Sequence, residues 1–218
     1  MATLIFDFDS TLVRCETLEE LVADQLAGDP SRAERYRAMT EAGMSGGWTF
    51  TESLTARLSV AAPGLADIES FTHRLDELWT DGMPDLVRKL HERGHEVWIV
   101  SGAPLEVISA AGVRLGVPQT RVRGVRLVWD DRGGFRSVDP EDPFARSKVE
   151  GLAGLAGGWP RPRLMIGDGL TDRAVFDRGL VDHFIPFTAH VRRDVVLRGD
   201  IQEARSTAEL EALIESLT

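Results

Sequence analysis

Residues 4–16 read LIFDFDSTLVRCE, and this stretch decides the expected fold. A short apolar run, residues 4–6, leads directly into Asp7, and a single Phe separates Asp7 from Asp9. Apolar runs without alternation are typical of strands that are buried on both faces, as in a parallel sheet covered by helices. Side chains two positions apart on an extended chain point to the same side, so both carboxylates face one site unless the strand ends first. Their repulsion then needs a neutralising partner.

Two further apolar runs, residues 97–100 and 164–166, have the same character. Helical patterns that begin near Met83 and Pro104 alternate with these runs, which predicts an α/β fold with a doubly wound, mostly parallel sheet. In open sheets of this kind, ligands bind beyond the carboxyl ends of the strands. The polar residues expected to meet there are Asp7, Asp9, Ser101, Gly102 and Asp168.

The chain between the first strand and Met83 shows helical patterns and no convincing strand. Thr17 and Glu20 resemble a capping box that starts the first of these helices. The remaining helical patterns cover approximately residues 31–42, 50–60 and 66–78.

We therefore expect two structural parts. Residues 1–14 and 79–218 form the α/β core, and residues 15–78 form a helical cap inserted after the first strand. An insert at this point overhangs the crevice as a lid. Within the core, residues 125–138 predict a hairpin with a Gly-rich turn.

Composition narrows the class of protein. The chain has 218 residues, is 43% hydrophobic and has a formal net charge of −10, which argues against non-specific binding to nucleic acid or anionic membranes. Its single cysteine, Cys15, fits a reducing compartment. No apolar stretch is long enough to span a bilayer, and residues 2–6 are too short for a signal peptide. We expect a cytoplasmic monomer or homodimer.

The acidic residues indicate a site for a phosphate group. Asp168 and Asp172 lie four positions apart after the third apolar run, and Lys148 precedes that run. Carboxylate oxygens are suitable ligands for Mg²⁺. A metal and a lysine stabilise phosphoryl charge, while a carboxylate can attack phosphorus. The expected partner is a small-molecule phosphate ester.

Four motifs resemble those of the haloacid dehalogenase superfamily of phosphatases. They are DFDST at 7–11, Ser101-Gly102, Lys148, and GDGLTD at 167–172, in the same order along nearly the whole chain. The resemblance implies that Asp7 is the nucleophile that forms an aspartyl-phosphate. It also implies that Asp9 protonates the leaving oxygen and then activates water.

The same resemblance implies the ligands of Mg²⁺ and of the phosphoryl group. Magnesium would be held by the side chains of Asp7 and Asp168 and by the backbone carbonyl of Asp9. Ser101 and Lys148 would bind the phosphoryl oxygens. The remaining implied contacts are the substrate contacts of Gly102 and Thr171, and Asp172, which would orient Lys148 or the water shell of the metal.

The opening segment and the segment GMSGGWTFTESLTARL at 43–58 resemble the phosphoserine phosphatase branch of the superfamily. The resemblance implies that Glu16 and Arg57 bind the ammonium and the carboxylate of phosphoserine, as opposite charges would. Met44 and Phe50 would close the apolar side. The implied function is hydrolysis of O-phosphoserine in serine biosynthesis.

Simpler interpretations remain open for several of these residues. Glu16 could be a first-turn acid favoured by the helix dipole, and Arg57 could lie on a solvated helix face. Met44 and Phe50 could be ordinary core residues. Other residues have structural alternatives as well: a turn and an N-cap for Asp168 and Asp172, a strand end for Ser101 and Gly102, and an exposed helix position for Lys148.

Other functions compete with this one. The nearest alternative is the same chemistry on another small phosphorylated metabolite, or phosphoryl transfer to an alcohol instead of water. A signalling receiver also combines acids, Ser or Thr, and Lys around an aspartyl-phosphate. Its phosphorylated Asp usually follows an inner strand of the chain, and it lacks a helical insert.

Overall fold

The computed structural model describes residues 1–44, 47–199 and 201–218, and its core is one parallel sheet. Five strands lie in the order β3-β2-β1-β6-β7, which confirms the predicted doubly wound fold. The strands are β1 (Thr3–Phe6), β2 (Glu96–Pro104), β3 (Val122–Val125), β6 (Arg163–Gly167) and β7 (His183–Pro186).

Both faces of the sheet are buried, which explains the apolar runs. Alternate residues of β1 enter different hydrophobic clusters: Ile5 packs with Trp98 and Met165, whereas Leu4 and Phe6 belong to the larger cluster on the other face. Leu4, Ile5 and Phe6 are completely buried. A strand with two apolar faces needs apolar side chains at every position.

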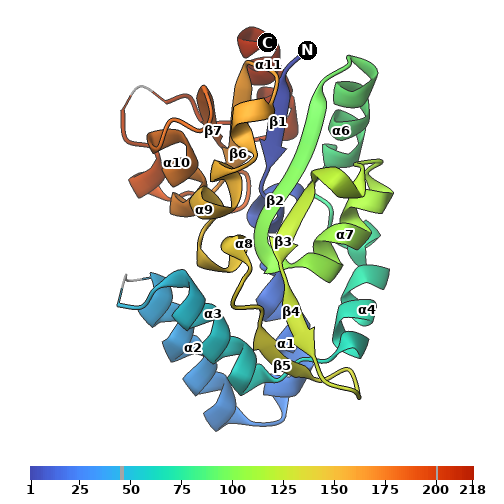
Figure 1. Ribbon diagram of the computed structural model, residues 1–218, viewed down its shortest axis with the longest axis vertical. Coiled ribbons are helices and arrows are strands. Elements are labelled where there is room, and N and C mark those ends of the chain that lie inside the picture. The colour runs from blue at the N-terminus through green and yellow to red at the C-terminus, as the bar shows by residue number, and fades with distance from the viewer. Residues whose placement is uncertain (45–46, 200) are drawn as a thin grey trace.

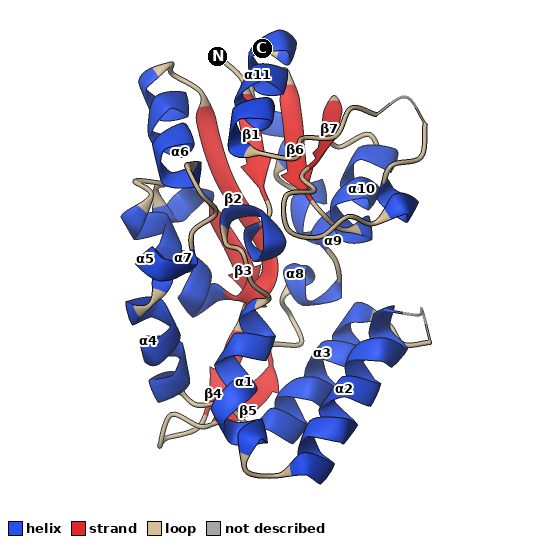
Figure 2. Ribbon diagram, turned by 180° about the vertical axis from the view of Figure 1, so that it is seen from behind, coloured by secondary structure: helices blue, strands red, loops and turns tan. Residues whose placement is uncertain are grey.

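Helices cover each face. Figures 1 and 2 show α6 (Met83–Glu92) and α7 (Leu105–Arg114) along one side, and α9 (Lys148–Ala153) and α10 (Leu170–Asp177) along the other. The predicted start of α6 is confirmed, and Gly94 follows its end at a φ of +79°. The chain closes with α11 (Thr207–Leu217), which packs on α6.

The predicted helical insert is confirmed as five helices within the described residues. They are α1 (Thr17–Ala27), α2 (Pro30–Met44), α3 (Phe50–Ala61), α4 (Leu65–His73) and α5 (Leu75–Leu78). Figure 1 shows α1, α2 and α3 below the sheet, at the end opposite both chain termini. Helix α4 differs from these three because it packs beside α7 of the core. The division at residues 14/15 and 78/79 stays a prediction.

The hairpin is confirmed as β4 (Leu127–Trp129) and β5 (Phe135–Val138). It packs against α3, and Gly64 pairs with Gly134 in an isolated bridge. The N–H of Leu65 donates to the carbonyl of Gly133 at 2.8 Å. Residues that the sequence assigned to the core therefore lie against the cap helices (Figure 1).

Short turns complete the chain. A π-helical turn, η1 (Phe8–Leu12), follows β1, and α8 (Pro143–Arg146) precedes α9. The 3₁₀ turns are η2 (Gln119–Arg121), η3 (Ala156–Gly158) and η4 (Asp194–Val196). Among the described residues, no helix combines the length and apolar character needed to cross a bilayer.

Three local predictions were wrong. The pattern at 66–78 forms two helices because Arg74, with φ −90° and ψ 0°, ends α4 and precedes α5. Val125 belongs to the unpredicted strand β3, so the hairpin starts at Leu127. Thr17 does not form a capping box: the N-cap of α1 is Glu16, and the Thr17 hydroxyl donates instead to Asp9.

Candidate active site

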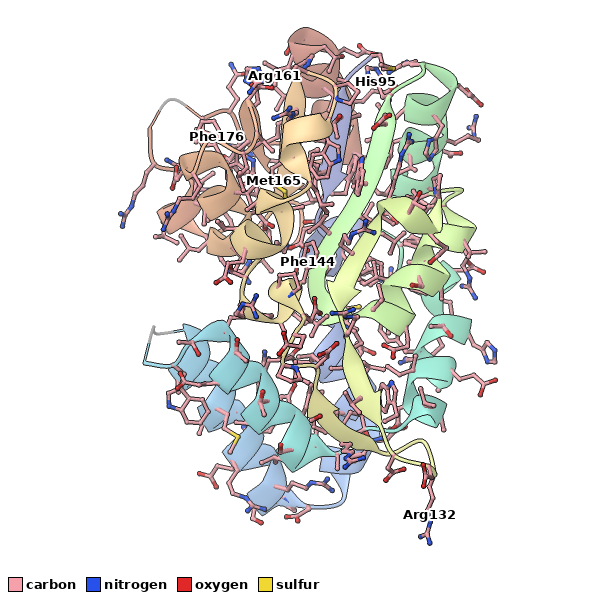
Figure 3. All side chains as sticks on the ribbon, viewed as in Figure 1. His95, Arg132, Phe144, Arg161, Met165 and Phe176 are labelled. Carbon is pink, nitrogen blue, oxygen red and sulfur yellow. The ribbon has the colours of Figure 1, made fainter. Side chains whose placement is uncertain are left out.

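A cavity lies beyond the carboxyl ends of β1, β2 and β6, where the cap faces the core. Figure 3 places Phe144 of α8, which also lines this cavity, between the strands and the cap helices. The predicted residues on its wall are Asp7, Asp9, Glu16, Phe50, Arg57, Ser101, Gly102, Lys148, Asp168 and Thr171. Residues from both ends of the chain thus meet at the edge of the sheet where α/β proteins bind ligands.

The turn after β1 separates the two aspartates. The strand ends at Phe6, so the alternation that would place Asp7 and Asp9 on one side of an extended chain is interrupted by η1. Asp7 accepts a hydrogen bond from the N–H of Phe8 at 2.7 Å. Asp9 accepts from the N–H of Thr17 at 3.1 Å and from its hydroxyl. Both side chains still line the same cavity, with Asp9 fixed by the first turn of α1.

Lys148 joins two of the carboxylates. Its Nζ lies 2.7 Å from Oδ1 of Asp7 and 2.6 Å from Oδ1 of Asp172. Because the residue is only 6% exposed, the alternative of a solvated helix lysine is excluded. Burial alone lowers its pKa, but the charges of Asp172 and Asp7 outweigh that effect and raise it. The protonated form of the amine is therefore favoured beside Asp7 and Asp172.

Asp172 lies behind the cavity wall, completely buried. Its Oδ2 accepts the N–H of Gly169 at 3.0 Å, and its Oδ1 contacts Lys148. Gly169 is the N-cap of α10, so Asp172 caps that helix from its third position and is not the N-cap itself. A Cβ on Gly167 would lie 2.3 Å from this oxygen, so the carboxylate needs glycine there. Burial, and next the charge of Asp7, raise the pKa of Asp172 to about 7, against the opposing effect of Lys148.

Three carboxylates form a possible metal site. Oxygens of Asp7, Asp168 and Asp172 all lie within 4.8 Å of one another, and all three residues are buried. Hard oxygen donors of this kind fit Mg²⁺. Asp7 and Asp168 were predicted as metal ligands, whereas Asp172 was expected to orient Lys148 or the water shell of the metal. The acidic side chains thus suit a divalent cation, and repulsion among them explains why one would be needed.

Ser101 and Gly102 lie in an irregular part of β2. Pairing with β3 shifts register between Val100 and Pro104, so the strand continues beyond the predicted end at Val100. Irregularities of this type re-aim side chains at functional sites. Oγ of Ser101 accepts the N–H of Ala103 at 3.1 Å, which leaves the hydroxyl proton for an acceptor in the cavity.

Phe50 reaches from the cap to the core at Gly102. A Cβ on Gly102 would lie 2.8 Å from the Phe50 ring, closer than real Cβ atoms approach. Phe50 is half-buried, so it packs against the core and also forms part of the cavity wall.

We expect Gly102→Ala to push the Phe50 ring away and to lower stability by about 1–3 kcal/mol, as overpacking does elsewhere. The substrate KM should rise because the cap loses its contact with β2. Urea unfolding and steady-state kinetics measure both effects. Gly154→Ala is the matched control, because no atom lies within 4 Å of a Cβ at that position. If both variants have the same stability and the same KM, the close contact between Gly102 and the Phe50 ring is contradicted.

Glu16 and Arg57 face the cavity from the cap side. The side chain of Glu16 is 46% exposed, and its Oε1 accepts a hydrogen bond from the Ser10 hydroxyl at 2.8 Å. Arg57 is 14% exposed and pairs with Glu19 at 3.4 Å, so it does not lie on a solvated face. Its Nε is buried and has no hydrogen-bond partner among the residues that the structure describes. An unsatisfied buried donor on a cavity wall can serve a ligand.

Two more residues, Thr171 and Met44, were predicted to contact the substrate. Thr171 lies on α10 at the cavity mouth and is exposed. Met44 ends α2, and its side chain lies outside the described part of the structure.

Sequence reasoning missed Arg193. It follows β7 and lines the cavity, where its Nη1 pairs with Oδ2 of Asp168 and its Nη2 lies 4.0 Å from Oε1 of Glu16. The signal that could have found it is its place after a further parallel strand, whose carboxyl end also reaches this edge of the sheet.

Asp9 has a raised pKa. Burial is the main effect that raises its pKa well above the usual value, and the charges of Glu16 and Asp7 add to it. The hydrogen bonds from Thr17 act in the opposite direction. A carboxyl group with a raised pKa is suited to hold a proton, which is how other sites give one of two neighbouring carboxyl groups the role of acid.

The sequence and the fold are similar to those of known hydrolases. A family model described as haloacid dehalogenase-like hydrolase matches residues 4–177. The chain belongs to this family. It is 30% identical over 194 residues to the chloroplastic phosphoserine phosphatase of Arabidopsis thaliana, a match that covers 88% of this chain and 64% of that protein. The chain thus spans less than two thirds of the length of that relative.

Solved structures agree. A phosphoserine phosphohydrolase-like protein from Francisella tularensis has a TM-score of 0.89 at 33% identity, covering 98% of this chain and 100% of its own. A phospho-aspartyl intermediate analogue of a phosphoserine phosphatase has a TM-score of 0.75 at 25% identity, covering 100% and 99%. The prediction of a phosphoserine phosphatase-like enzyme of the haloacid dehalogenase family is confirmed.

Proposed function

We propose that the chain is a Mg²⁺-dependent phosphomonoesterase that hydrolyses O-phospho-L-serine to L-serine and phosphate, as a step of serine biosynthesis. One observation carries the reaction type: buried Lys148 lies between Asp7 and Asp172, on a wall that also holds Ser101 and Asp168. Asp7 thus has a lysine, a hydroxyl donor and further carboxylates around it, and such a set of groups suits phosphoryl transfer.

Asp7 is the nucleophile in this proposal. The Phe8 N–H and Lys148 both bind its Oδ1, so the side chain is oriented before substrate arrives. One carboxylate oxygen attacks phosphorus, a bond forms to Asp7, and the bond from phosphorus to the seryl oxygen breaks. Lys148 and the Ser101 hydroxyl bind the phosphoryl oxygens and stabilise the charge that grows on them.

Asp9 is the general acid and then the general base in this proposal. It carries a proton when substrate binds and donates that proton to the departing seryl oxygen. Its raised pKa favours the protonated form. As a carboxylate it then takes a proton from the water that attacks the aspartyl-phosphate, which restores Asp7 and releases phosphate. The hydrogen bonds from Thr17 keep Asp9 oriented through both steps.

Magnesium completes the site. Asp7, Asp168 and Asp172 present the carboxylates that would hold it, and the Asp9 carbonyl is a further ligand implied by the family. When bound, the metal supplies charge stabilisation at the phosphoryl group. Asp168 and Asp172 are both buried.

Two charged residues support phosphoserine as the substrate. Glu16 offers a carboxylate for the ammonium group, and Arg57 offers an unsatisfied donor for the carboxylate. Phosphate release from a panel of phosphorylated metabolites, with and without Mg²⁺, should show phosphoserine as the preferred substrate and little activity without the metal. If another phosphate ester is preferred, the proposed reaction type still holds, but phosphoserine is not the substrate.

We expect Glu16→Gln and Arg57→Ala each to lower kcat/KM for phosphoserine about 10- to 100-fold, since each removes a hydrogen bond to a charged group. Turnover of p-nitrophenyl phosphate, which lacks both groups, should change little. Glu20→Gln is the control: Glu20 lies on the same helix but pairs with Arg74 outside the cavity. The substrate assignment fails if both variants hydrolyse phosphoserine at the parental rate.

The setting of this reaction also stays a proposal. The single Cys15 is free, which fits the cytoplasm, although the Arabidopsis relative is chloroplastic. A monomer or homodimer is still expected, and a phosphate ester remains the proposed partner.

A further inference from the structure

Arg57 contacts side chains from two other helices of the cap. It lies on α3, while Glu19 belongs to α1 and Tyr36 to α2. Figures 1 and 2 show these three helices together below the sheet. Of the three residues, the proposed function uses only Arg57, as the group that receives the substrate carboxylate. An arginine side chain has many rotamers, so neighbours that fix its direction reduce the entropy lost when a ligand binds.

Glu19 fixes one end of the guanidinium group. Its Oε1 lies 3.4 Å from Nη1 of Arg57, and its side chain also lines the cavity. The Nε and Nη2 atoms of a guanidinium group form one edge that can bind both oxygens of a carboxylate, and Nη1 lies beyond that edge. Nε of Arg57 is buried and has no hydrogen-bond partner in the described part of the chain. Glu19 therefore binds the part of the group that a carboxylate on this edge does not need.

Tyr36 supports the face of the same group. Cζ of Arg57 lies 6.0 Å from the centroid of the Tyr36 ring, a distance at which an aromatic ring still attracts a cation. Tyr36 is 3% exposed and belongs to the larger hydrophobic cluster, so its ring is held in place by packing. It is not on the cavity wall, so any effect that it has on a substrate passes through Arg57.

We propose that Glu19 and Tyr36 are positioning residues that turn the Nε–Nη2 edge of Arg57 toward the substrate carboxylate. The inference rests on the proposed function and adds two residues that the sequence motifs did not indicate. It predicts that both residues strengthen the preference for phosphate esters that carry a carboxylate and leave the phosphoryl chemistry unchanged.

A purely electrostatic role of Glu19 predicts the opposite sign. A carboxylate on the cavity wall repels a substrate carboxylate, so its removal alone would favour such substrates. Glu19→Gln removes the charge but keeps an oxygen that can accept from Nη1, whereas Glu19→Ala removes both. Positioning therefore predicts a loss of preference in Glu19→Ala only, and repulsion alone predicts a gain in both variants.

Two matched substrates measure this preference. Phosphoethanolamine has the phosphate ester and the ammonium of O-phosphoserine but lacks the carboxylate. The carboxylate preference is the kcat/KM for O-phosphoserine divided by the kcat/KM for phosphoethanolamine. We expect Glu19→Ala and Tyr36→Leu each to lower it about 5- to 10-fold, mainly through a higher KM for phosphoserine, because each removes one contact that orients Arg57. Glu19→Gln should not lower it, and Tyr36→Phe, which keeps the ring, should stay within about 2-fold of the wild type.

The controls separate positioning from a general structural effect. In an Arg57→Ala background, neither Glu19→Ala nor Tyr36→Leu should change the carboxylate preference, because both act through Arg57. Glu20→Ala should also leave it unchanged, since Glu20 pairs with Arg74 and is not on the cavity wall. A loss of stability alone lowers the turnover of both substrates and cancels in the ratio. Thermal unfolding identifies the folded variants, and Glu19→Ala decides the inference if Tyr36→Leu does not fold.

A carboxylate preference in Glu19→Ala that rises, or that stays within about 2-fold of the wild type, would overturn the inference. A folded Tyr36→Leu protein with the wild-type preference would do so as well. The proposed function fails in a different way: the wild type itself then shows no preference for phosphoserine over phosphoethanolamine. The two failures are thus separate results, one seen in the wild type and the other only in the variants.

Discussion

Replacing Asp7 with Asn is expected to lower phosphoserine turnover by about 10⁴-fold or more, as the loss of a covalent nucleophile does in other hydrolases. An amide is a poor nucleophile toward phosphorus and removes one negative charge beside Lys148. Brief incubation with ³²P-labelled substrate and acid quenching should leave label on the wild-type protein and none on the variant.

The same variant must be shown to fold. Asp7→Asn keeps the size of the side chain and an oxygen that can accept the Phe8 N–H, so a cooperative thermal transition should persist. Asp85→Asn is the matched control: Asp85 is exposed and pairs with Arg88 on the surface of α6. A folded Asp7→Asn protein with the parental rate would remove the aspartyl-phosphate from the proposal.

Lys148→Met is expected to destabilise the metal-free protein by about 3–5 kcal/mol, because it leaves buried carboxylates without a counter-charge. Met has a similar length, so the change isolates the charge. Turnover should also fall by about 10³-fold, since Lys148 binds the phosphoryl oxygens in the proposed reaction. Urea unfolding in EDTA measures the first effect, and single-substrate kinetics with Mg²⁺ measure the second.

The loss of stability should depend on pH in a defined direction. The pKa of Asp172 is raised to about 7, so the folded state binds its proton more tightly than the unfolded state does. Stability contributed by that proton is present below the ordinary carboxyl pKa and is lost as pH rises toward 7. Without Lys148 the pKa rises further and the loss extends to higher pH.

Lys148→Met should therefore be more damaging at pH 8 than at pH 5, where Asp172 is protonated and needs no counter-charge. Lys148→Arg, which keeps a charge, should show a much smaller pH effect. Equal losses for Lys148→Met at both pH values would show that the Lys148–Asp172 pair does not set stability here.

The sequence was sufficient for the fold class and for most of the site. Apolar runs of three or four residues predicted β1, β2 and β6 because strands buried on both faces carry no polar alternation. Their polar ends predicted which residues would meet, since parallel strands of one sheet end at a common edge. Lys148, Ser101 and Asp168 all line the cavity as expected.

Other features depend on contacts distant in the chain. Strand β3 has the short, mixed sequence VRGV and is recognisable only beside β2. Thr17 had the local pattern of a cap, but the nearby Asp9 accepts its hydroxyl hydrogen bond instead. Arg193 gains meaning only from Asp168, 25 positions earlier, and from Glu16 at the other end of the chain.

The β4–β5 hairpin has a consequence for how this enzyme can change its specificity. Backbone hydrogen bonds join Leu65 to Gly133 and Phe135 to Pro63, so residues far apart in the chain form one seam. A chimera that transplants only residues 15–78 from a relative would break that seam and mismatch the β-bridge at Gly64. Grafting residues 126–139 together with the helices preserves these contacts, so a transplanted cap needs two segments of the chain rather than one.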